Sequence, residues 1–462
     1  MARPLPLAAA SPRGFYTVET WGCQMNVHDS EKMAGALRGL GLAPTGDPRR
    51  ADVILLNTCA VRDKATQKVF AALGRLRRLK RRNPRLVIGV TGCVAQLEGS
   101  EIFERAPFVD LVLGPRGISA LPELLARARE GRAIQLEPLE ASLTPPFEST
   151  ARAEGVKAYV TVMEGCNKRC TFCIVPRTRG REDSRPLRHI LQEVEFLAGR
   201  GFREVELLGQ NVNAYRFGDT DFAGLLRAVD RVPGLERVRF TTSHPLHFSD
   251  AIIGAVAAGE RICPSIHLPP QSGSTRVLRR MRRGYTREGY LERVRRLRRA
   301  VPSCTLSADI IVGFPGETDD DFEQTMTLLE EVRYAKVFSF VFSPRPDTPA
   351  AQMADDTPPE VNRERLARLQ ARQLEIQAEI HAGQVGARLP VLIEGPAKSG
   401  DGVFVGRSPE GFIVHFPGHD GMRGRTLPVT IGSVTAQALY GEVTPGPLRP
   451  EREFLDFSQG GR

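Results

Sequence analysis

The sequence predicts an α/β protein with three parts: a doubly wound N-terminal domain, a central partial (βα)6 barrel and a small C-terminal β-barrel. Two stretches of alternating β-branched runs and helical segments are separated by a proline-containing stretch, and short glycine-punctuated strands follow a long helix. A chain of 462 residues is also long enough for roughly two to four domains, each with its own buried core.

The N-terminal domain is expected over residues 14–131. Its β-branched runs are each followed by a segment of helical periodicity, and they cover residues 15–20, 53–58, 86–91 and 111–114. This alternation is typical of a doubly wound parallel sheet. Residues 133–153 carry Pro138, Pro145 and Pro146 without clear periodicity, so we interpret them as a linker.

The central domain is expected over residues 152–382. The alternation repeats six times there, with strands at 159–164, 204–209, 238–243, 265–268, 306–312 and 337–342. Six parallel units predict a partial barrel whose functional residues follow the carboxyl ends of its strands. A charged helix from Pro359 to about Ala382 closes this part.

The C-terminal domain is expected over residues 383–446. Short strands at 389–393, 403–406, 412–416 and 427–431 predict a β-barrel of the size of an oligonucleotide-binding fold.

The amino-acid composition excludes several classes of protein. Apolar residues (41%) and charged residues (26%) are present in the proportions of a folded globular protein, which excludes a disordered chain or a fibre. No apolar run is long enough to span a membrane and no signal-peptide core is present, so we expect a cytoplasmic protein. In a reducing compartment, eight cysteines indicate metal or redox chemistry rather than a disulfide framework.

Three cysteines follow the first strand of the central domain with C-x3-C-x2-C spacing. We call Cys166, Cys170 and Cys173 the second cysteine set, because another set of three precedes them in the chain. This spacing can bring three thiolates to an iron-sulfur cube and leave one iron open for a substrate. The alternatives are a zinc site that lacks its fourth ligand, or three unrelated cysteines.

Three further cysteines each follow a strand of the N-terminal domain. We call Cys23, Cys59 and Cys93 the first cysteine set. Neighbouring strand ends meet at one edge of a doubly wound sheet, so intervals of 36 (59−23) and 34 (93−59) residues still allow a second cluster with an open iron. The alternative is that they are small buried apolar residues, which is how we interpret Cys263 and Cys304.

The second cysteine set resembles the signature of the radical S-adenosylmethionine (SAM) superfamily, in which SAM binds the open iron. The resemblance implies a 4Fe-4S cluster, SAM as a cofactor and SAM contacts at strand ends. The positions that match the SAM-contacting places are Phe172, Gly209, Gln210, Asn211, Gly313, Gly316 and Glu317. No catalytic residue beyond the cluster ligands is predicted.

Motifs across nearly the whole chain resemble the radical SAM methylthiotransferase family. They include Gly22-Cys23-Gln24-Met25-Asn26, Asn57-Thr58-Cys59, Gly92-Cys93-Val94-Ala95, Met163-Glu164-Gly165-Cys166, Thr178-Arg179-Gly180, Gly209-Gln210-Asn211, Ser243-His244-Pro245 and Pro269-Pro270-Gln271-Ser272-Gly273. The resemblance implies two 4Fe-4S clusters and a C-terminal TRAM domain, a small RNA-binding module.

Within this family the chain is most similar to the branch that adds a methylthio group at C2 of N6-isopentenyl (dimethylallyl) adenosine 37 of tRNA. Gln24 and Met25 stand where members acting on the ribosomal protein S12 aspartate usually have Pro-Lys. That aspartate, or threonylcarbamoyladenosine in tRNA, remains an alternative substrate. A metal-stabilised RNA-binding protein without catalysis is the alternative from another class.

The net charge of +10 favours a polyanionic partner, and the family resemblance implies that this partner is the tRNA anticodon stem-loop. Basic runs at 75–85, 276–283 and 293–299 are candidate RNA contacts or simply solvated helix faces, and Arg407, Arg423 and Arg425 are candidates in the last domain. The family further implies an electron donor such as flavodoxin or ferredoxin and a sulfur source. A monomer is the default expectation.

Overall fold

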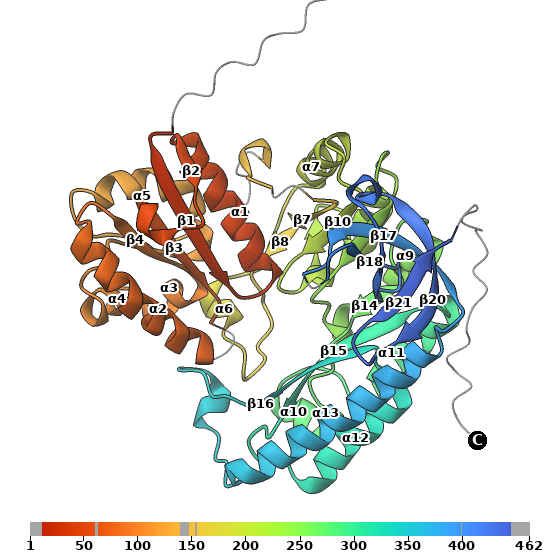
Figure 1. Ribbon diagram of the computed structural model, residues 1–462. Coiled ribbons are helices and arrows are strands. Elements are labelled where there is room, and N and C mark those ends of the chain that lie inside the picture. Colours follow the sequence, from red (N-terminus) through yellow and green to blue (C-terminus); the bar gives the residue numbers. More distant parts are fainter. Residues whose placement is uncertain (1–11, 61–62, 139–146, 153–154, 399, 445–462) are drawn as a thin grey trace, which may run out of the picture. The chain divides into compact units, whose positions relative to one another are not determined.

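The computed structural model describes residues 12–60, 63–138, 147–152, 155–398 and 400–444, which form two compact units (Figure 1). Unit 1 comprises Met1–Ala153 together with Arg177–Gly180, and unit 2 comprises Glu154–Pro176 and Arg181–Arg462. Pro145 and Pro146 of the expected linker and residues 445–446 of the expected C-terminal domain lie outside the described residues. In the ranges given, no helix combines the length and apolar character that crossing a membrane requires.

Unit 1 contains a six-stranded sheet in the order β2-β1-β3-β4-β5-β6, and every neighbouring pair is parallel. Its strands are β1 (Gly14–Trp21), β2 (Leu42–Pro44), β3 (Val53–Thr58), β4 (Val87–Gly92), β5 (Leu111–Leu113) and β6 (Ala133–Gln135). Its helices are α1 (Gln24–Gly39), α2 (Asp63–Arg82), α3 (Cys93–Glu98), α4 (Glu101–Arg105) and α5 (Leu121–Ala128).

Helices cover both faces of this sheet, as a doubly wound fold requires. Successive side chains of a strand point to opposite faces, so Val53 and Leu55 of β3 pack in the core with α1 and α5. Ile54 and Leu56 pack in the other core, with α2, α3 and α4. The continuous apolar runs of the sequence reflect this burial on both faces.

We did not predict β2, β6 or the last strand of the C-terminal barrel from the sequence. Strands β2 and β6 are three-residue edge strands, and β2 contains Pro44, which cannot donate to a sheet. The sheet therefore extends to Gln135, into the stretch interpreted as a linker.

Unit 2 begins with six parallel strands in two linked sheets, β7-β10-β13 and β14-β15-β16. The two sheets meet where Val238 pairs with Ile262, through backbone hydrogen bonds of 2.8 and 2.9 Å to Arg261 and Cys263. These strands are β7 (Lys157–Thr161), β10 (Glu204–Leu208), β13 (Arg237–Phe240), β14 (Ser265–His267), β15 (Thr305–Val312) and β16 (Lys336–Val341). They form the expected partial (βα)6 barrel.

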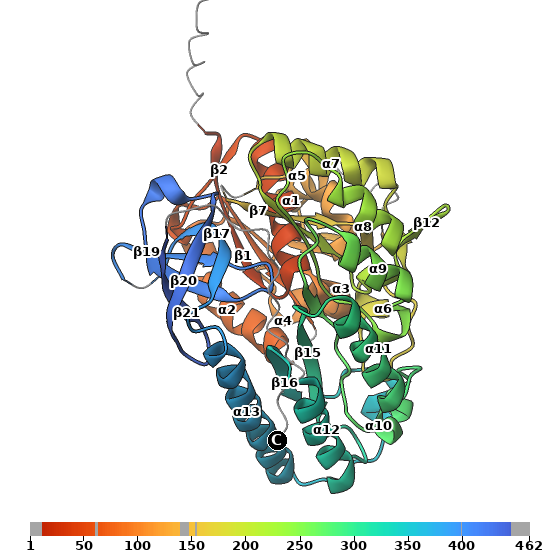
Figure 2. The same cartoon turned by 90° about the vertical axis from the view of Figure 1, so that its right-hand side faces the viewer.

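Helices follow these strands along their outer side, as Figure 2 shows for α7, α8, α9 and α11. The helices of unit 2 are α6 (Val175–Thr178), whose second half belongs to unit 1, α7 (Leu187–Gly199), α8 (Phe222–Asp230), α9 (Asp250–Ala258), α10 (Thr275–Arg280), α11 (Arg287–Ala300), α12 (Asp319–Val332) and α13 (Pro359–Ala382). Two short antiparallel pairs are added: β8 (Met163–Glu164) with β9 (Asp183–Ser184), and β11 (Arg216–Phe217) with β12 (Thr220–Asp221).

The chain ends in a closed five-stranded barrel in the order β17-β18-β19-β21-β20. Its strands are β17 (Arg388–Pro396), β18 (Val403–Arg407), β19 (Ile413–Pro417), β20 (Thr426–Val434) and β21 (Leu439–Val443). Two buried arginines of β13 bind this barrel: Arg237 donates to the carbonyl oxygens of Arg407 and Pro390, and Arg239 donates to those of Ser408 and Pro409. The barrel is thus part of unit 2.

Candidate functional site

The first cysteine set lies at the carboxyl edge of the sheet in unit 1. Strands β1, β3 and β4 are adjacent, and their last paired residues are Trp21 with Thr58 and Thr58 with Gly92. Each cysteine of the set follows one of these positions by one or two residues. The order β2-β1-β3 also reverses direction between β1 and β3, and ligands of open α/β sheets bind at such a reversal.

The thiols of this set interact with one another. A hydrogen bond from Cys59, assisted by the positive charge of Arg179, lowers the pKa of Cys23 to about 6. Burial raises the pKa of Cys93, which also feels the charge on Cys23. Cys23 is exposed, Cys59 is half-buried and Cys93 is buried, so the set opens to solvent on one side.

Two buried asparagines hold Cys23 in place. The side-chain oxygen of Asn26 accepts from the Cys23 amide (3.3 Å) and its thiol (3.4 Å). The Asn26 amide group donates to Asn57 Oδ1 (3.2 Å), and Asn57 donates to the Asn26 carbonyl oxygen (2.8 Å) and Ser30 Oγ (2.9 Å). The motif asparagines therefore tie the end of β3 to the start of α1.

Glycine precedes two of these cysteines for steric reasons. A Cβ on Gly22 would lie 2.8 Å from Cys59 Cβ and 2.2 Å from Asn26 Oδ1. Gly92 has φ +84°, and a Cβ there would lie 2.5 Å from Asn57 Oδ1. Only a residue without a side chain lets the asparagines approach the cysteines this closely.

The second cysteine set occupies the loop between β8 and α6 in unit 2. The antiparallel pair β8 and β9 closes the base of this loop. The Cys173 amide donates to the Cys170 carbonyl oxygen (3.1 Å), the Lys168 amide donates to Cys166 Sγ (3.4 Å), and Arg283 Nη1 donates to Cys170 Sγ (3.4 Å). Burial raises the pKa of Cys166 to about 11 and that of Cys173 to about 12.

Each cysteine set offers three thiols, the donors that an iron-sulfur cube uses. Among the described residues, no group of three or more Cys, His, Asp or Glu side chains surrounds one metal position. Zinc needs its thiolates to converge on one point, whereas the thiolates of a cube each bind a different iron.

Two of the predicted SAM-contacting residues, Phe172 and Gln210, lie in or beside the loop of the second set. Phe172 packs edge-on against Phe314, with ring centroids 6.5 Å apart. Gln210 Oε1 accepts from the Gly165 amide (2.6 Å), one residue before Cys166, and Asn211 donates to Glu182 Oε1 (3.1 Å). Gly209 is required here because a Cβ would lie 2.6 Å from Met163 Cγ.

The turn from Gly313 to Glu317 has a largely structural arrangement. Gly313 and Gly316 have φ values of +69° and +74°. The Glu317 carboxylate accepts from the Gly313 amide (2.6 Å) and lies 3.5 Å from Arg365, and burial raises its pKa to about 7. Its polar atoms are therefore used inside the turn, and Gly313 and Gly316 shape the turn.

Polar atoms without hydrogen-bond partners lie just after the ends of β10 and β13. In the described chain, Asn211 Oδ1, Ser243 Oγ and His244 Nε2 are buried without hydrogen-bond partners. Burial and the nearby Arg283 lower the pKa of His244 to about 2, and its Nδ1 accepts from the Leu246 amide (3.2 Å). The neutral ring thus carries its proton on Nε2, and buried polar groups of this kind normally have partners.

Sequence reasoning missed two buried arginines that contact the cysteine sets. Arg283 lies in the basic run 276–283, which was a candidate RNA contact, but it is buried against Cys170. Arg179 belongs to a quoted motif, yet nothing in the sequence assigns it to the first set, where it hydrogen-bonds Cys93. Their positions depend on contacts between residues far apart in the chain.

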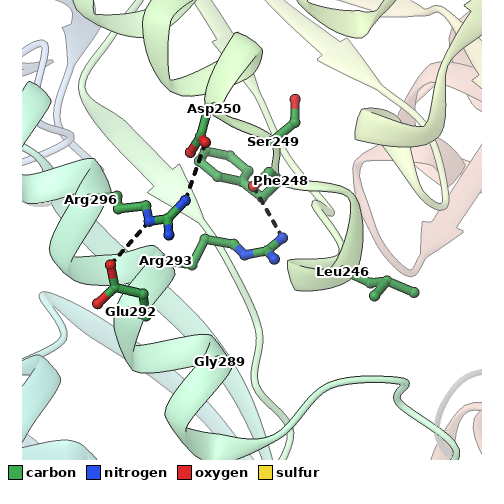
Figure 3. Close-up of a pocket in the computed structure, with 8 residues that line it drawn as sticks. All are labelled: Leu246, Phe248, Ser249, Asp250, Gly289, Glu292, Arg293 and Arg296. Atoms are coloured by element: carbon green, nitrogen blue, oxygen red, sulfur yellow. Dashed lines mark hydrogen bonds and ion pairs between the residues drawn. The ribbon is translucent and has the colours of Figure 1, made fainter.

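A separate pocket of about 460 Å³ lies between the start of α9 and α11 (Figure 3). Its charged groups pair with one another: Arg296 contacts Asp250 (3.2 Å) and Glu292 (3.0 Å), and Arg293 donates to the Phe248 carbonyl oxygen (3.2 Å). We assign no ligand to it.

Three family models match the chain. The uncharacterized protein family UPF0004 covers residues 16–114, the radical SAM superfamily covers 160–329, and the TRAM domain covers 383–444. Membership of the radical SAM superfamily implies SAM and a 4Fe-4S cluster. Among solved structures, the radical S-adenosylmethionine methyltransferase TsrM from Kitasatospora setae matches with a TM-score of 0.55 and 15% identity, covering 85% of this chain and 80% of that one. This match supports the fold.

Curated relatives cover almost the full length of the chain. Proteins of Bordetella bronchiseptica and Methylococcus capsulatus are each 48% identical, covering 95% and 94% of this chain and 94% and 96% of their own lengths. A protein of Syntrophotalea carbinolica is 45% identical over 93% of this chain and 99% of its own. All three are named tRNA-2-methylthio-N(6)-dimethylallyladenosine synthase. With both cysteine sets, the radical SAM match and the TRAM barrel in one chain, this protein belongs to the radical SAM methylthiotransferase family.

Proposed function

We propose that this protein adds a methylthio group at C2 of N6-dimethylallyladenosine 37 in tRNA, next to the anticodon. The observation that carries the proposal is the pair of cysteine sets in two different α/β units. The first follows the parallel strands β1, β3 and β4 of unit 1, and the second lies in the loop after β8 of unit 2. The names of the curated relatives support the same reaction.

Replacing the hydrogen of an unactivated C2–H bond requires a radical. A 4Fe-4S cluster held by the second set would supply the electron for reductive cleavage of SAM, and one held by the first set would supply the sulfur for methylation. Because ligands must be deprotonated, the buried thiols of Cys166 and Cys173 lose their protons as iron binds.

The chain's own residues position these groups and exclude water. The second set would hold its cluster in a loop that Gln210 fixes at Gly165, and Phe172 of this loop packs against Phe314. The neutral His244 presents an Nε2 proton as a donor toward a bound ligand. In unit 1, Asn26 and Asn57 hold Cys23 at the end of β1.

The RNA surface is best supported on α2. Arg75, Arg77, Arg78, Arg81 and Arg82 of α2 and the following Arg85 are exposed. In contrast, much of the other two runs is used internally: Arg276 pairs with Asp321, Arg283 contacts Cys170, and Arg298 donates to the Val332 carbonyl oxygen. Exposed arginines are suited to neutralise phosphates.

The C-terminal barrel offers a second RNA surface. Arg423 and Arg425 are exposed, whereas Arg407 lies 3.2 Å from Glu394. His415 and Tyr440 stack on the barrel with centroids 5.4 Å apart, and Tyr440 is exposed. Such a platform can stack an unpaired base.

The proposal includes further partners: an electron donor such as flavodoxin or ferredoxin, and a source of replacement sulfur. We also propose that the protein acts as a cytoplasmic monomer.

The test is anaerobic reconstitution followed by iron and sulfide analysis and substrate assays. We expect about eight irons per chain, methylthiolation of prenylated tRNA, little reaction with tRNA that lacks the prenyl group, and none with ribosomal protein S12. Modification of the S12 aspartate or of threonylcarbamoyladenosine alone would contradict the substrate assignment. Zinc without sulfide, with SAM left intact, would instead identify a metal-stabilised RNA-binding protein.

A further inference from the structure

A buried ion pair lies beside the first cysteine set. Arg179 Nη2 is 2.5 Å from Asp29 Oδ2, and the side chains are 2% and 1% exposed. Asp29 lies on the buried face of α1, the helix that begins directly after Cys23. Arg179 comes from residues Arg177–Gly180, which follow the second set in sequence but belong to unit 1.

The guanidinium of Arg179 contacts both Asp29 and the thiols. It donates a hydrogen bond to Cys93, and its charge acts on Cys23. A buried pair of this kind is weak evidence for stability, because desolvation offsets much of the attraction. Its nearness to the thiols suggests a role in the chemistry of the set.

The second set has a matching arginine with different surroundings. Arg283 is buried and donates to Cys170 Sγ (3.4 Å), as well as to Tyr285 Oη (3.1 Å) and the Pro269 carbonyl oxygen (3.2 Å). None of these partners is a carboxylate, whereas Arg179 is paired with one. Each set therefore has one buried guanidinium, but the carboxylate partner is at the first set.

We propose that Arg179, oriented by Asp29, is a positioning residue that sets the reduction potential of the cluster on the first set, and that Arg283 does so for the second set. The proposal rests on the proposed function, because it requires a cluster at each set. Hydrogen bonds to cluster sulfurs and nearby positive charge stabilise the reduced form, which carries more negative charge. Arg179 raises the potential and Asp29 lowers it.

The experiment isolates the first cluster in the full-length chain. A parent variant with Cys166, Cys170 and Cys173 changed to Ala keeps the first set alone, and its midpoint potential is measured by redox titration with electron paramagnetic resonance. In this background we expect Arg179→Gln to shift the midpoint to a more negative value and Asp29→Asn to shift it to a more positive value. Iron content should stay near four per chain.

Opposite shifts distinguish an electrostatic role from damage to the fold, which would not reverse its sign between the two partners. Arg283→Gln and Arg185→Gln are the matched controls in the same background. Arg185 forms another buried pair, with Glu193 (2.7 Å), in unit 2. Neither control should move the midpoint of the first cluster.

If Arg179→Gln loses its iron, Arg179→Lys is measured next. If Arg179→Lys, which retains the charge, binds iron again, the positioning role is supported. If both Arg179 variants lose iron and also lose secondary structure, the positioning role is overturned. Unchanged midpoints in iron-loaded variants of Arg179 and Asp29 would refute the inference and leave the proposed function standing. A parent variant that binds no iron would refute the two-cluster function itself.

Discussion

Replacing Arg239 by methionine tests what holds the C-terminal barrel on the central strands. The buried guanidinium donates to the carbonyl oxygens of Ser408 (2.7 Å) and Pro409 (3.0 Å). Its Nε lies 3.0 Å from the carboxylate of Glu204, which is only 2% exposed. Methionine retains an apolar side chain but removes the charge, so Glu204 loses this buried partner.

Removing one member of a buried ion pair costs about 3–5 kcal/mol, because the other charge stays desolvated. With a urea m-value of about 3 kcal/mol per M, the unfolding midpoint should fall by roughly 1–1.7 M. The double variant Arg239→Met with Glu204→Leu should recover part of this loss, because the orphaned carboxylate is gone.

The assay is urea unfolding of the full chain followed by two signals. Trp21 is the single tryptophan and lies in unit 1, so its fluorescence reports that unit, whereas far-ultraviolet circular dichroism reports both. We expect Arg239→Met to lower the unit 2 transition and leave the tryptophan transition in place. Arg203→Met is the control, since its exposed pair with Glu236 (3.7 Å) contributes at most about 1 kcal/mol. Equal shifts for both variants, or no shift for Arg239→Met, would refute the reasoning.

Three further predictions concern the sites. Changing all three cysteines of the second set to alanine should abolish SAM cleavage, whereas the same change in the first set should leave deoxyadenosine formation but stop methylthiolation. Chromatography measures deoxyadenosine, and nucleoside mass spectrometry measures methylthiolation. Full methylthiolation without the first set would contradict the two-cluster assignment. Gly92→Ala forces a Cβ to 2.5 Å from Asn57 Oδ1 at φ +84°, so we expect about 1–3 kcal/mol of destabilisation and less iron on the first set. Gly74→Ala on α2, where a Cβ meets open space, should cost nothing in the same assays. Burial raises the pKa of Glu317 to about 7, above its ordinary value of 4.5. The contribution of Glu317 to the free energy of unfolding is therefore fully present below about pH 4.5 and falls by roughly 3 kcal/mol as the pH rises through 7. Glu317→Gln should flatten this part of the stability profile, and an unchanged slope in denaturation at several pH values would assign it to another group.

The sequence predicted the long buried strands because they are apolar and β-branched on both faces. Strand β3 (Val53–Thr58) and helix α13 (Pro359–Ala382) occur at the predicted residues. Strand β21 was missed because Gly441 interrupts its pattern, and a Cβ there would lie 2.2 Å from the Thr430 carbonyl oxygen. Such a position is set by tertiary contact, which no local pattern reveals.

The proximity of the three cysteines of the first set could be predicted from the sequence. Each follows a parallel strand directly, and the ends of adjacent strands in one sheet lie close together. The contacts of the two buried arginines could not be predicted, because Arg179 is 150 residues from Asp29 and Arg283 is 113 residues from Cys170 in the sequence. The basic run around Arg283 suggested RNA, and only its burial shows that the guanidinium faces a thiol.

The two proposed cluster sites share one physical difficulty. A cluster needs thiolates, yet burial raises the pKa of Cys93, Cys166 and Cys173 and so favours the neutral thiol. Backbone amides in the turns that follow the strands offset part of this effect, because they lower the pKa of Cys23, Cys166 and Cys173. A buried guanidinium at each site supplies both positive charge and a donor, and an arginine remains charged there because its intrinsic pKa is so high. Placing Arg179 and Arg283 far along the chain from the cysteines they contact means that each site is complete only when its unit has folded.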